Sequence, residues 1–312
     1  MKVLVTGAAG FTGRCMMHYL VHREGLELTG MVHDLPLGAS TAKIAQKSCI
    51  LADLLDRDHL FAKVAGVCPD AIVHLAGRTH GTLDELLEAN VAGTKNILDA
   101  GYTANPDCRM VVISSSAVYG YKGTRAIRES ARLQPLSEYG ISKMAQDEYA
   151  LMYYRLHDAN VCVARPFNLV GAGQPETFVC ANIVKQVAEI EEKEKQALDL
   201  LETTSSRDFI DVRDAVRGYW ELASCPEFSR DCAGKAFNLG SGTASSIAKI
   251  VSLVEEITGR HYEMNLPATP PRITLFSQQS DNTRITRLTG WIPEIPLRDT
   301  LLHMLDSVRK ER

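Results

Sequence analysis

The sequence predicts an α/β fold in which a mainly parallel sheet is covered by helices on both faces. Short apolar runs alternate with helix-like stretches through the first half of the chain, and a glycine-rich turn follows the first run directly. Such alternation is typical of right-handed βαβ units, because parallel neighbours need a crossover connection. The 312 residues can form a substantial core in one large domain or in two interleaved ones.

Five apolar runs in the first half of the chain are expected to form the sheet. They read KVLVTG, ELTGMV, AIVHLAG, RMVVIS and NVCVARP, at residues 2–7, 27–32, 71–77, 109–114 and 160–166. Helix-like stretches at 83–103 and 138–156 lie between them. We therefore expect a doubly wound sheet over residues 1–166.

The pattern loosens after Pro166, which predicts a smaller C-terminal α/β domain over most of residues 167–312. Helices are expected at 245–260 and 295–310, a loop at 266–272, and a solvent-facing helical stretch in the charged run at 189–196. Residues around 208–240 are expected to return to the first domain.

The composition excludes several classes of protein. With 34 Lys and Arg against 38 Asp and Glu, the formal charge is −4, so no nucleic-acid surface is expected. No apolar run approaches the ~20 residues of a membrane span. The N-terminus enters the first strand at once, which leaves no room for a signal peptide.

The cysteines and histidines indicate neither a metal site nor a disulfide framework. The eight cysteines are scattered without a CxxC pair, and no HExxH occurs among the nine histidines. We expect reduced thiols in a cytoplasmic protein.

The turn VLVTGAAGFTGR has the spacing of a phosphate cradle. Gly7 permits a tight turn, Gly10 lets the backbone approach a pyrophosphate, and Gly13 lets the helix pack close to the strand. The helix that begins at Phe11 and Thr12 would offer its free N–H groups to the phosphates. The sequence therefore predicts a Rossmann-type domain that binds NAD or NADP.

The choice between NAD and NADP stays open. If Asp34 is the acid that holds the ribose hydroxyls, NAD is favoured. If Val32 occupies that place, His33 and Arg14 are candidates to face a 2′-phosphate; His33 and Asp34 can also be ordinary loop residues. The other residues expected beside the cofactor are Asp53, Leu54, Leu75, Ala76 and Gly77.

Tyr139 and Lys143 stand four residues apart in EYGISK, within a helical pattern, so both side chains lie on one helix face. A phenol normally titrates near 10, but a lysine cation and an oxidised nicotinamide beside it would lower that pKa and make it a proton carrier. By itself the pair also fits a surface contact.

The strand VVISSSAVYG, at residues 111–120, ends in three consecutive serines. Serines often end strands by bonding to nearby backbone. They can also deliver a hydroxyl to a site where a proton moves. The glycine cradle and the Tyr–Lys pair favour the second interpretation.

These motifs together resemble the extended short-chain dehydrogenase/reductases, the group of nucleotide-sugar epimerases, dehydratases and reductases. TGAAGFTG, HLAG, NVAGTKNIL, SSSAVYG, YGISK, RPFNLVGAGQ, RDFIDVRDAVRGYW, FNLGSG and TGWIPEIPL follow the family order along nearly the whole chain. The resemblance implies that Ser115, Tyr139 and Lys143 are catalytic, that Ser116 assists, and that Ser114 is structural.

The second half is most similar to GDP-4-keto-6-deoxy-mannose reductases, through RPFN, GQ, the following FV pair and RDF. That resemblance implies that Asn168, Arg207 and Arg272 contact the nucleotide sugar, since guanidinium groups suit phosphate. Thr79 is expected to reach the sugar; for His80 a plain loop position is expected. Surface solvation is the alternative for both arginines.

Some residues depart from the family patterns. Ala117 stands where 4,6-dehydratases carry an acid, which argues against dehydration. Leu169 and Ala172 replace the family His and Pro, and residues 200–206 replace the usual GN turn. These changes leave the identity of the substrate open.

The resulting prediction is an oxidoreductase that moves hydride between a nicotinamide and C4 of a nucleotide-linked hexose, most similar to a 4-ketoreductase. The alternative is a 4-epimerase that keeps NAD tightly bound. An alternative of another class is a non-catalytic dinucleotide-binding regulator. The resemblance also implies a homodimer formed through the helices at 83–103 and 138–156.

Overall fold

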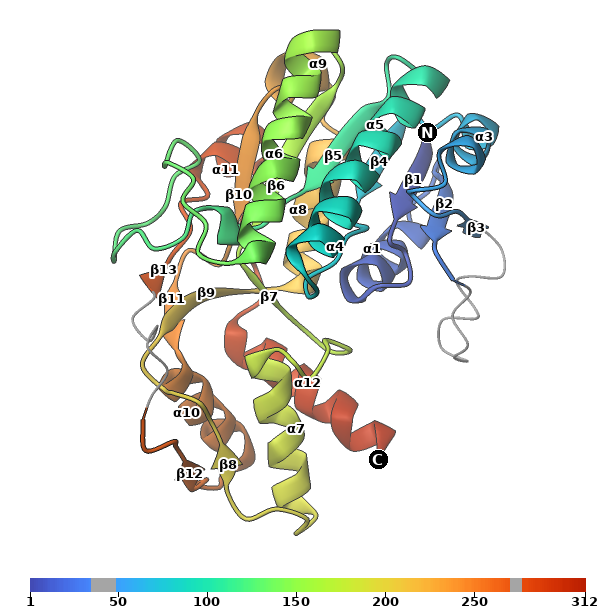
Figure 1. The fold of residues 1–312 in the computed structure, drawn as a ribbon. Helices are drawn as coiled ribbons and strands as arrows, with labels where there is room; N and C mark the ends of the chain where they lie inside the picture. The colour runs from blue at the N-terminus through green and yellow to red at the C-terminus, as the bar shows by residue number, and fades with distance from the viewer. Residues whose placement is uncertain (35–48, 270–276) are drawn as a thin grey trace.

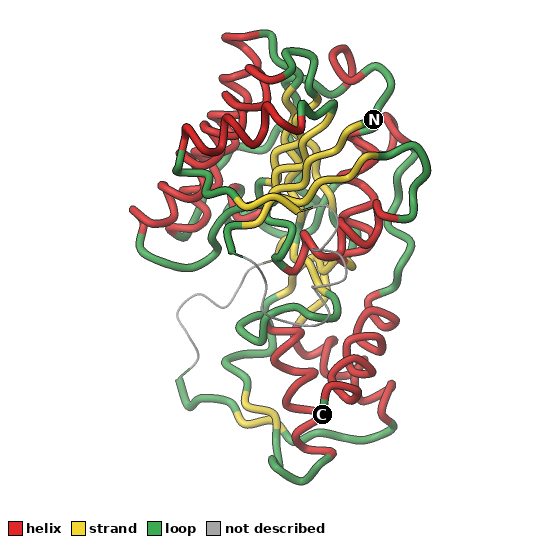
Figure 2. Tube along the Cα trace, turned by 90° about the vertical axis from the view of Figure 1, so that its right-hand side faces the viewer, coloured by secondary structure: helices red, strands yellow, loops and turns green. Residues whose placement is uncertain are grey.

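The computed structural model describes residues 1–34, 49–269 and 277–312. Figure 1 shows two parts, a large sheet with helices on either side and a smaller part that holds the C-terminus. Figure 2 shows the same division from the side, with the strands of the large sheet enclosed by helices.

The large sheet has seven strands in the order β10-β6-β5-β4-β1-β2-β3, and every neighbouring pair is parallel. This confirms the predicted α/β class and all five predicted strands. The chain order within the sheet reverses between β1 and β4, so their carboxyl ends open a crevice where α/β proteins bind ligands. The strands are β1 (Lys2–Thr6), β2 (Glu27–Val32), β3 (Cys49–Leu51), β4 (Ala71–His74), β5 (Arg109–Ile113), β6 (Val161–Pro166) and β10 (Ala236–Leu239).

Each face of this sheet has its own apolar core. Val3 and Val5 pack beneath α1 (Phe11–Val21) and α8 (Val212–Ala223), whereas Leu4 packs with residues of α3 (Arg57–Val67), α5 (Gly93–Ala104) and α6 (Glu138–His157). Alternation along β1 produces this division, because successive side chains of a strand point to opposite faces.

The helix expected at 83–103 is interrupted. α4 (Leu83–Leu87) runs into a π-helical turn (Glu88–Ala92) before α5 begins at Gly93. The turn buries Asn90, whose amide bonds to both backbone groups of Arg78 and to the Ser142 hydroxyl. These bonds favour the wider turn over a regular helix at this point.

The smaller part has a core between three helices, α7 (Val179–Glu191), α10 (Ile247–Thr258) and α12 (Leu297–Glu311). The predicted helix at 245–260 has the caps that its sequence indicates: Ser246 accepts from the N–H of Lys249, and Gly259 takes a φ of 67°. The expectation of a helical charged run at 189–196 was wrong beyond Glu191, where α7 ends.

A second sheet lies between the two parts and centres on β9 (Ser206–Asp211). It is flanked by β7 (Asn168–Val170), β11 (Ala244–Ser246) and β13 (Ser277–Gln278), while β8 (Leu198–Asp199) and β12 (Met264–Asn265) form a separate pair. After β9 the chain enters α8 and then α9 (Phe228–Asp231) and β10, which joins the large sheet beside β6. The remaining helices are the 3-10 turn at Ser116–Val118 and α11 (Thr283–Thr289).

Within the described residues, no helix combines the length and the apolar character that a membrane crossing requires.

Candidate active site

The glycine turn after β1 has the close packing that its spacing predicts. A Cβ on Gly7, whose φ is +67°, would lie 2.8 Å from the backbone N of Ala76, and a Cβ on Gly13 would lie 2.0 Å from the Gly7 carbonyl oxygen. α1 begins at Phe11 with Gly10 as a cap that offers no side chain, so the first-turn N–H groups of Phe11 and Thr12 are free to bind an anion. The turn therefore fits the pyrophosphate of a dinucleotide.

His33, after β2, lies between two carboxylates. Its Nδ1 is 2.8 Å from Asp34 and its Nε2 is 3.6 Å from Asp53. The hydrogen bond to Asp34 is the main cause that raises the pKa of His33 above its ordinary value. Asp53 also accepts from the N–H of Leu55, and Leu54 packs against Gly93.

Arg14 does not project toward the end of β2. Its guanidinium donates to the carbonyl of Ala9 in the glycine turn (2.8 Å) and to that of Gly173 (3.3 Å). Arg14 therefore joins the phosphate cradle to the loop at 171–174.

A buried polar network fixes the protonation of His74. Thr94 donates its single hydroxyl proton to the Asn90 carbonyl and accepts from the Gln146 amide, so His74 Nε2, at 2.9 Å, must also donate to it. His74 Nδ1 then accepts from the Thr6 hydroxyl at 2.7 Å. Burial lowers the pKa of His74 to about 3, which agrees with this neutral tautomer.

This network holds the loop that covers the glycine turn. The Thr6 hydroxyl accepts from the N–H of Ala76 at 3.1 Å, and the Ala76 backbone lies against Gly7. Leu75 packs on the core beneath α1, and a Cβ on Gly77 would lie 2.5 Å from the Asn90 side chain. These contacts hold the loop 75–77 directly beside the cradle.

Ser115 and Tyr139 come together at the carboxyl edge of the sheet. Ser115 ends the strand-like stretch and accepts from the N–H of Ala117, while its side chain lies close to that of Tyr139 in the first turn of α6. Burial raises the pKa of Tyr139 above its ordinary value, and the nearby Ser115 hydroxyl partly offsets that rise. Ser142 accepts from Asn90 and donates to the Tyr139 carbonyl, which anchors this turn.

Lys143 is buried one turn further along α6. Its Nζ donates to the Ile113 carbonyl at 2.6 Å, and burial lowers its pKa to about 7, against a smaller opposing effect of Asp147. The predicted lowering of the Tyr139 pKa depends on a lysine cation together with an oxidised nicotinamide; for the chain by itself, burial raises the pKa of the phenol, and Lys143 is not among the causes of that shift.

The other two serines have different partners. Ser114 continues the β5–β6 pairing through its N–H and donates its hydroxyl to the Lys143 carbonyl at 3.4 Å. Ser116 is buried, and its hydroxyl faces the side-chain carbonyl of Gln278 at 3.5 Å.

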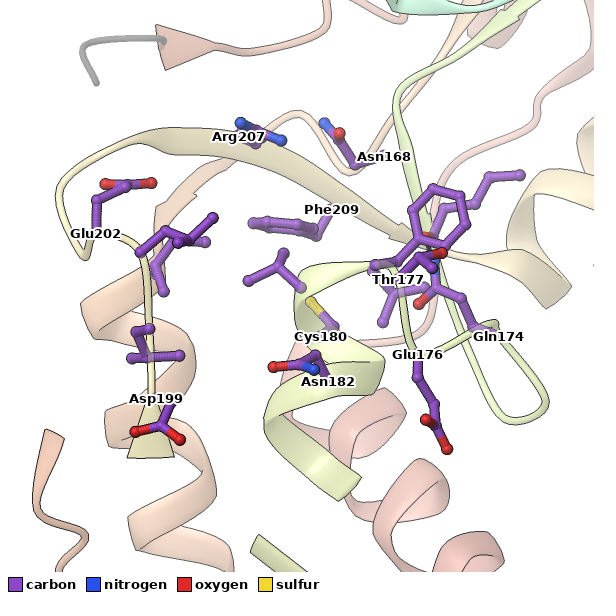
Figure 3. Close-up of a pocket in the computed structure, with 17 residues that line it drawn as sticks. Asn168, Gln174, Glu176, Thr177, Cys180, Asn182, Asp199, Glu202, Arg207 and Phe209 are labelled. Carbon is purple, nitrogen blue, oxygen red and sulfur yellow. Dashed lines mark hydrogen bonds between the residues drawn. The ribbon is translucent and has the colours of Figure 1, made fainter. Parts of the chain in front are cut away.

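A pocket of about 570 Å³ lies between β9 and α7 in the smaller part. Figure 3 shows Arg207, Asn168 and Phe209 along one edge, above Cys180 and Asn182 of α7. Asn168 donates to the Asp208 carbonyl. No hydrogen bond or ion pair joins the Arg207 guanidinium to another described residue, so this cation is available to a ligand.

The Thr79–His80 loop belongs to the larger part of the molecule and lies against the same pocket. The two side chains bond to one another at 2.8 Å, and the His80 ring packs edge-on against Phe178, which lines the pocket. Arg272 lies outside the described residues.

Several residues of the site were not found from sequence. His74 belongs to HLAG, which we read only as part of the cofactor face, and its partners Thr6 and Thr94 lie far away in the chain. Gln278 lies in a short polar stretch with no periodic signal.

The comparisons with known proteins agree with this geometry. The model of the NAD dependent epimerase/dehydratase family matches residues 3–240. GDP-6-deoxy-D-mannose reductase of Pseudomonas aeruginosa is 30% identical over 98% of this chain and 96% of that protein. UDP-glucose 4-epimerase of Mycolicibacterium smegmatis is 28% identical over 100% of this chain and 99% of that protein.

Among solved structures, RMD from Pseudomonas aeruginosa complexed with NADPH has a TM-score of 0.83 and 28% identity, covering 99% of both chains. The cradle, the Ser115–Tyr139 pair and these matches agree: the chain belongs to the NAD-dependent epimerase/dehydratase family, as an enzyme that uses NAD or NADP to act on nucleotide sugars.

Proposed function

We propose that this protein reduces the C4 ketone of a nucleotide-linked 6-deoxyhexose, with a GDP-4-keto-6-deoxy-mannose as the first candidate. The observation that carries the proposal is the approach of the Ser115 side chain to Tyr139 at the carboxyl edge of the sheet, where burial raises the pKa of the phenol and it keeps its proton at neutral pH. A reductase must protonate the carbonyl oxygen, so a protonated phenol is the form it needs. The 30% identity to GDP-6-deoxy-D-mannose reductase supports the same direction.

In this reaction Tyr139 Oη gives its proton to the ketone oxygen, and the Ser115 hydroxyl orients that oxygen. The bound nicotinamide coenzyme supplies the hydride to the carbon. Lys143, four residues along α6, has a pKa of about 7 and therefore exchanges a proton readily near neutral pH. Its Nζ is suited to hold the coenzyme ribose and to return a proton toward Tyr139.

The substrate would bind across the two parts of the chain. Residues 1–166 with 208–240 would hold the coenzyme, and the rest of 167–312 would hold the nucleotide sugar. Arg207 supports this division because its guanidinium faces the pocket without a described partner, as a diphosphate site requires. Asn168 lines the same pocket, and Thr79 lies in the loop that packs on it.

The experiment is a coenzyme oxidation assay with the purified protein. GDP-4-keto-6-deoxy-mannose should oxidise NADH or NADPH in stoichiometric amounts, and the product should be the corresponding 6-deoxyhexose. The proposal fails if the protein binds coenzyme and GDP but leaves the reduced nicotinamide unchanged with this substrate.

A 4-epimerase is the second candidate, favoured by the full-length match to UDP-glucose 4-epimerase. Such an enzyme would purify with NAD bound and interconvert a nucleotide sugar and its C4 epimer without net oxidation of coenzyme. A reductase must exchange its coenzyme in every cycle.

We also propose a cytoplasmic homodimer formed through α5 and α6. An aromatic cluster of Tyr102, Tyr149, Tyr153 and His157 lies on these helices, and Leu156 is 67% exposed beside it. The eight cysteines are all free thiols, as is usual in a reducing compartment. Sedimentation of the wild type and of Leu156→Glu tests the dimer: the variant should be monomeric, and a wild-type monomer would refute it.

A further inference from the structure

Gln278 lies between Arg207, the residue proposed to bind the diphosphate, and the turn that carries Ser115 and Ser116. It lies in β13, which pairs in parallel with β9, and its register partner is Arg207. Register partners in neighbouring strands project to the same face of a sheet. Gln278 and Arg207 therefore face the same side of this small sheet.

The Gln278 side chain crosses to the segment that carries the reactive serine. Its Nε2 donates to the Gly120 carbonyl at 3.0 Å, and its Oε1 lies 3.5 Å from the Ser116 hydroxyl. Gly120 has a φ of +65°, and a Cβ there would lie 1.9 Å from the Gln134 carbonyl oxygen, so this tight turn requires glycine. One amide thus holds both ends of the turn at 116–120.

The backbone of β13 is fixed as well. The Gln279 carbonyl accepts from the N–H of Ile127 at 2.7 Å, and Ser280 donates to the buried Asp208 carboxylate through its N–H and its hydroxyl. Asp208 follows Arg207 directly in β9. The same short stretch therefore contacts the serine turn on one side and the strand of Arg207 on the other.

We propose that Gln278 is a positioning residue that sets the separation between the Ser115–Ser116 turn and Arg207. A diphosphate held by Arg207 then places the sugar carbonyl at Ser115 and Tyr139. Gln278 itself exchanges no proton with the substrate. This inference rests on the proposed function of the site.

The amide group suits this task because it is neutral and carries both a donor and an acceptor. Leucine has a similar size but neither function. The carboxylate of a Gln278→Glu variant would still accept from the Ser116 hydroxyl. When ionised, its second oxygen would face the Gly120 carbonyl, which is also an acceptor, so that hydrogen bond would be lost. Protonation of the carboxylate would supply a donor to this carbonyl again.

The test compares three variants in the full-length protein: Gln278→Leu, Gln278→Glu and the control Gln279→Leu. Gln279 is the matched control because its amide also donates to a carbonyl, that of Gly242 at 2.7 Å, without contacting the serine turn. Gln278→Leu should lower kcat about tenfold with a change in KM below about threefold, and Gln279→Leu should lower kcat less than about twofold. Gln278→Glu should recover activity as the pH falls.

A double-mutant cycle with Ser116→Ala separates positioning from general structural damage. If Gln278 acts through the serine turn, the double variant should be no slower than the worse single variant. Multiplied losses, or a Gln278→Leu variant as fast as the control, would overturn the proposal.

Hydrogen exchange gives a measurement that needs no substrate. Peptides covering residues 116–121 should exchange several-fold faster in Gln278→Leu than in Gln279→Leu, while peptides of α10 stay unchanged. Faster exchange without activity on any keto sugar would refute the proposed function and leave the positioning role in place. Unchanged exchange would overturn the positioning role whatever the activity.

Discussion

The side chains of Ser115 and Tyr139 lie close enough for the serine to lower the pKa of the phenol, and this contact joins the end of β5 to the first turn of α6. Ser115 and Tyr139 are each held by a separate set of contacts. Ser115 is fixed by the N–H of Ala117, and the Tyr139 turn is fixed through Ser142 and Asn90. The pair is therefore preorganised by the chain itself, which is what transfer of a proton to a bound ketone requires.

Tyr139→Phe should abolish turnover because it removes the proton donor and keeps the ring. We expect kcat to fall at least about 100-fold, the lower range for loss of a positioned acid, with coenzyme affinity changed less than about threefold. Steady-state rates and coenzyme titration measure both. Tyr102→Phe, on α5, whose hydroxyl donates to the His157 carbonyl, is the control; a Tyr139→Phe enzyme that keeps a tenth of the wild-type rate would contradict this role.

Arg207→Gln should weaken substrate binding more than it slows the chemistry. Its guanidinium lines the pocket without a described partner, so its charge is available to a diphosphate. We expect KM to rise about 10- to 100-fold, since hydrogen bonds to charged groups contribute about 1.5–3 kcal/mol. Arg128→Gln, whose guanidinium is paired with Asp281, is the control. An unchanged KM and an unchanged affinity for GDP would place the diphosphate elsewhere.

Asp34→Asn should shift the coenzyme preference toward NADP. The Asp34 carboxylate would repel the 2′-phosphate of NADP. Removing its charge should change the binding free energy of NADP relative to NAD by about 1 kcal/mol, the energy of two exposed charges in contact. This corresponds to about a fivefold change in the ratio of the two dissociation constants. Titration with NAD and NADP at one ionic strength measures the ratio.

The wild-type ratio should also shift toward NADP as the pH falls, because the raised pKa of His33 adds a cation beside the phosphate. His33→Ala should lose that pH dependence. If the ratio stays constant in Asp34→Asn and across pH, these groups do not contact the ribose.

Lys143 should make the stability of the fold depend on pH. Its pKa is about 7 in the folded protein and near 10.4 when unfolded, so between these values the unfolded chain binds more protons. The free energy of unfolding should therefore rise with pH, by up to about 1.4 kcal/mol per pH unit, relative to Lys143→Met. Denaturant unfolding from pH 7 to 9.5 measures the difference; parallel curves for the two proteins would show that the folded lysine keeps its charge.

Thr94→Val should destabilise the protein by about 2–6 kcal/mol. The change removes the acceptor of two buried donors, His74 Nε2–H and the Gln146 amide, and each unsatisfied group costs about 1–3 kcal/mol. Ser252→Ala is the control, because the Ser252 hydroxyl also donates to the carbonyl four residues earlier, that of Ala248, but at an exposed site on α10. Equal losses in the two variants would mean that His74 has another tautomer.

The large sheet and the meeting of Ser115 with Tyr139 can be predicted from the sequence for a physical reason. The central strands, such as β1 and β4, are buried on both faces and appear as continuous apolar runs, and the glycine turn has a spacing that few other structures need. The positions of Ser115 and Tyr139 came from short motifs on two elements that the sheet order brings together.

The rest of the site depends on contacts that no local pattern encodes. β13 consists of two polar residues, and its position depends on hydrogen bonds that the next two residues form with Asp208 and Ile127. The π-helical turn is stabilised by hydrogen bonds of the Asn90 side chain to Arg78 and Ser142, which belong to other segments of the chain. Burial raises the pKa of Tyr139, and a short sequence motif carries no information on how deeply its residues are buried.

The most direct measurement is the transfer of a deuterium label from the C4 position of reduced nicotinamide to the nucleotide sugar. We predict that a GDP-4-keto-6-deoxy-mannose incubated with labelled NADH or NADPH gives a product with deuterium at C4 of the sugar, in step with oxidised coenzyme. Formation of an epimer without label and without net oxidation of coenzyme would contradict the account.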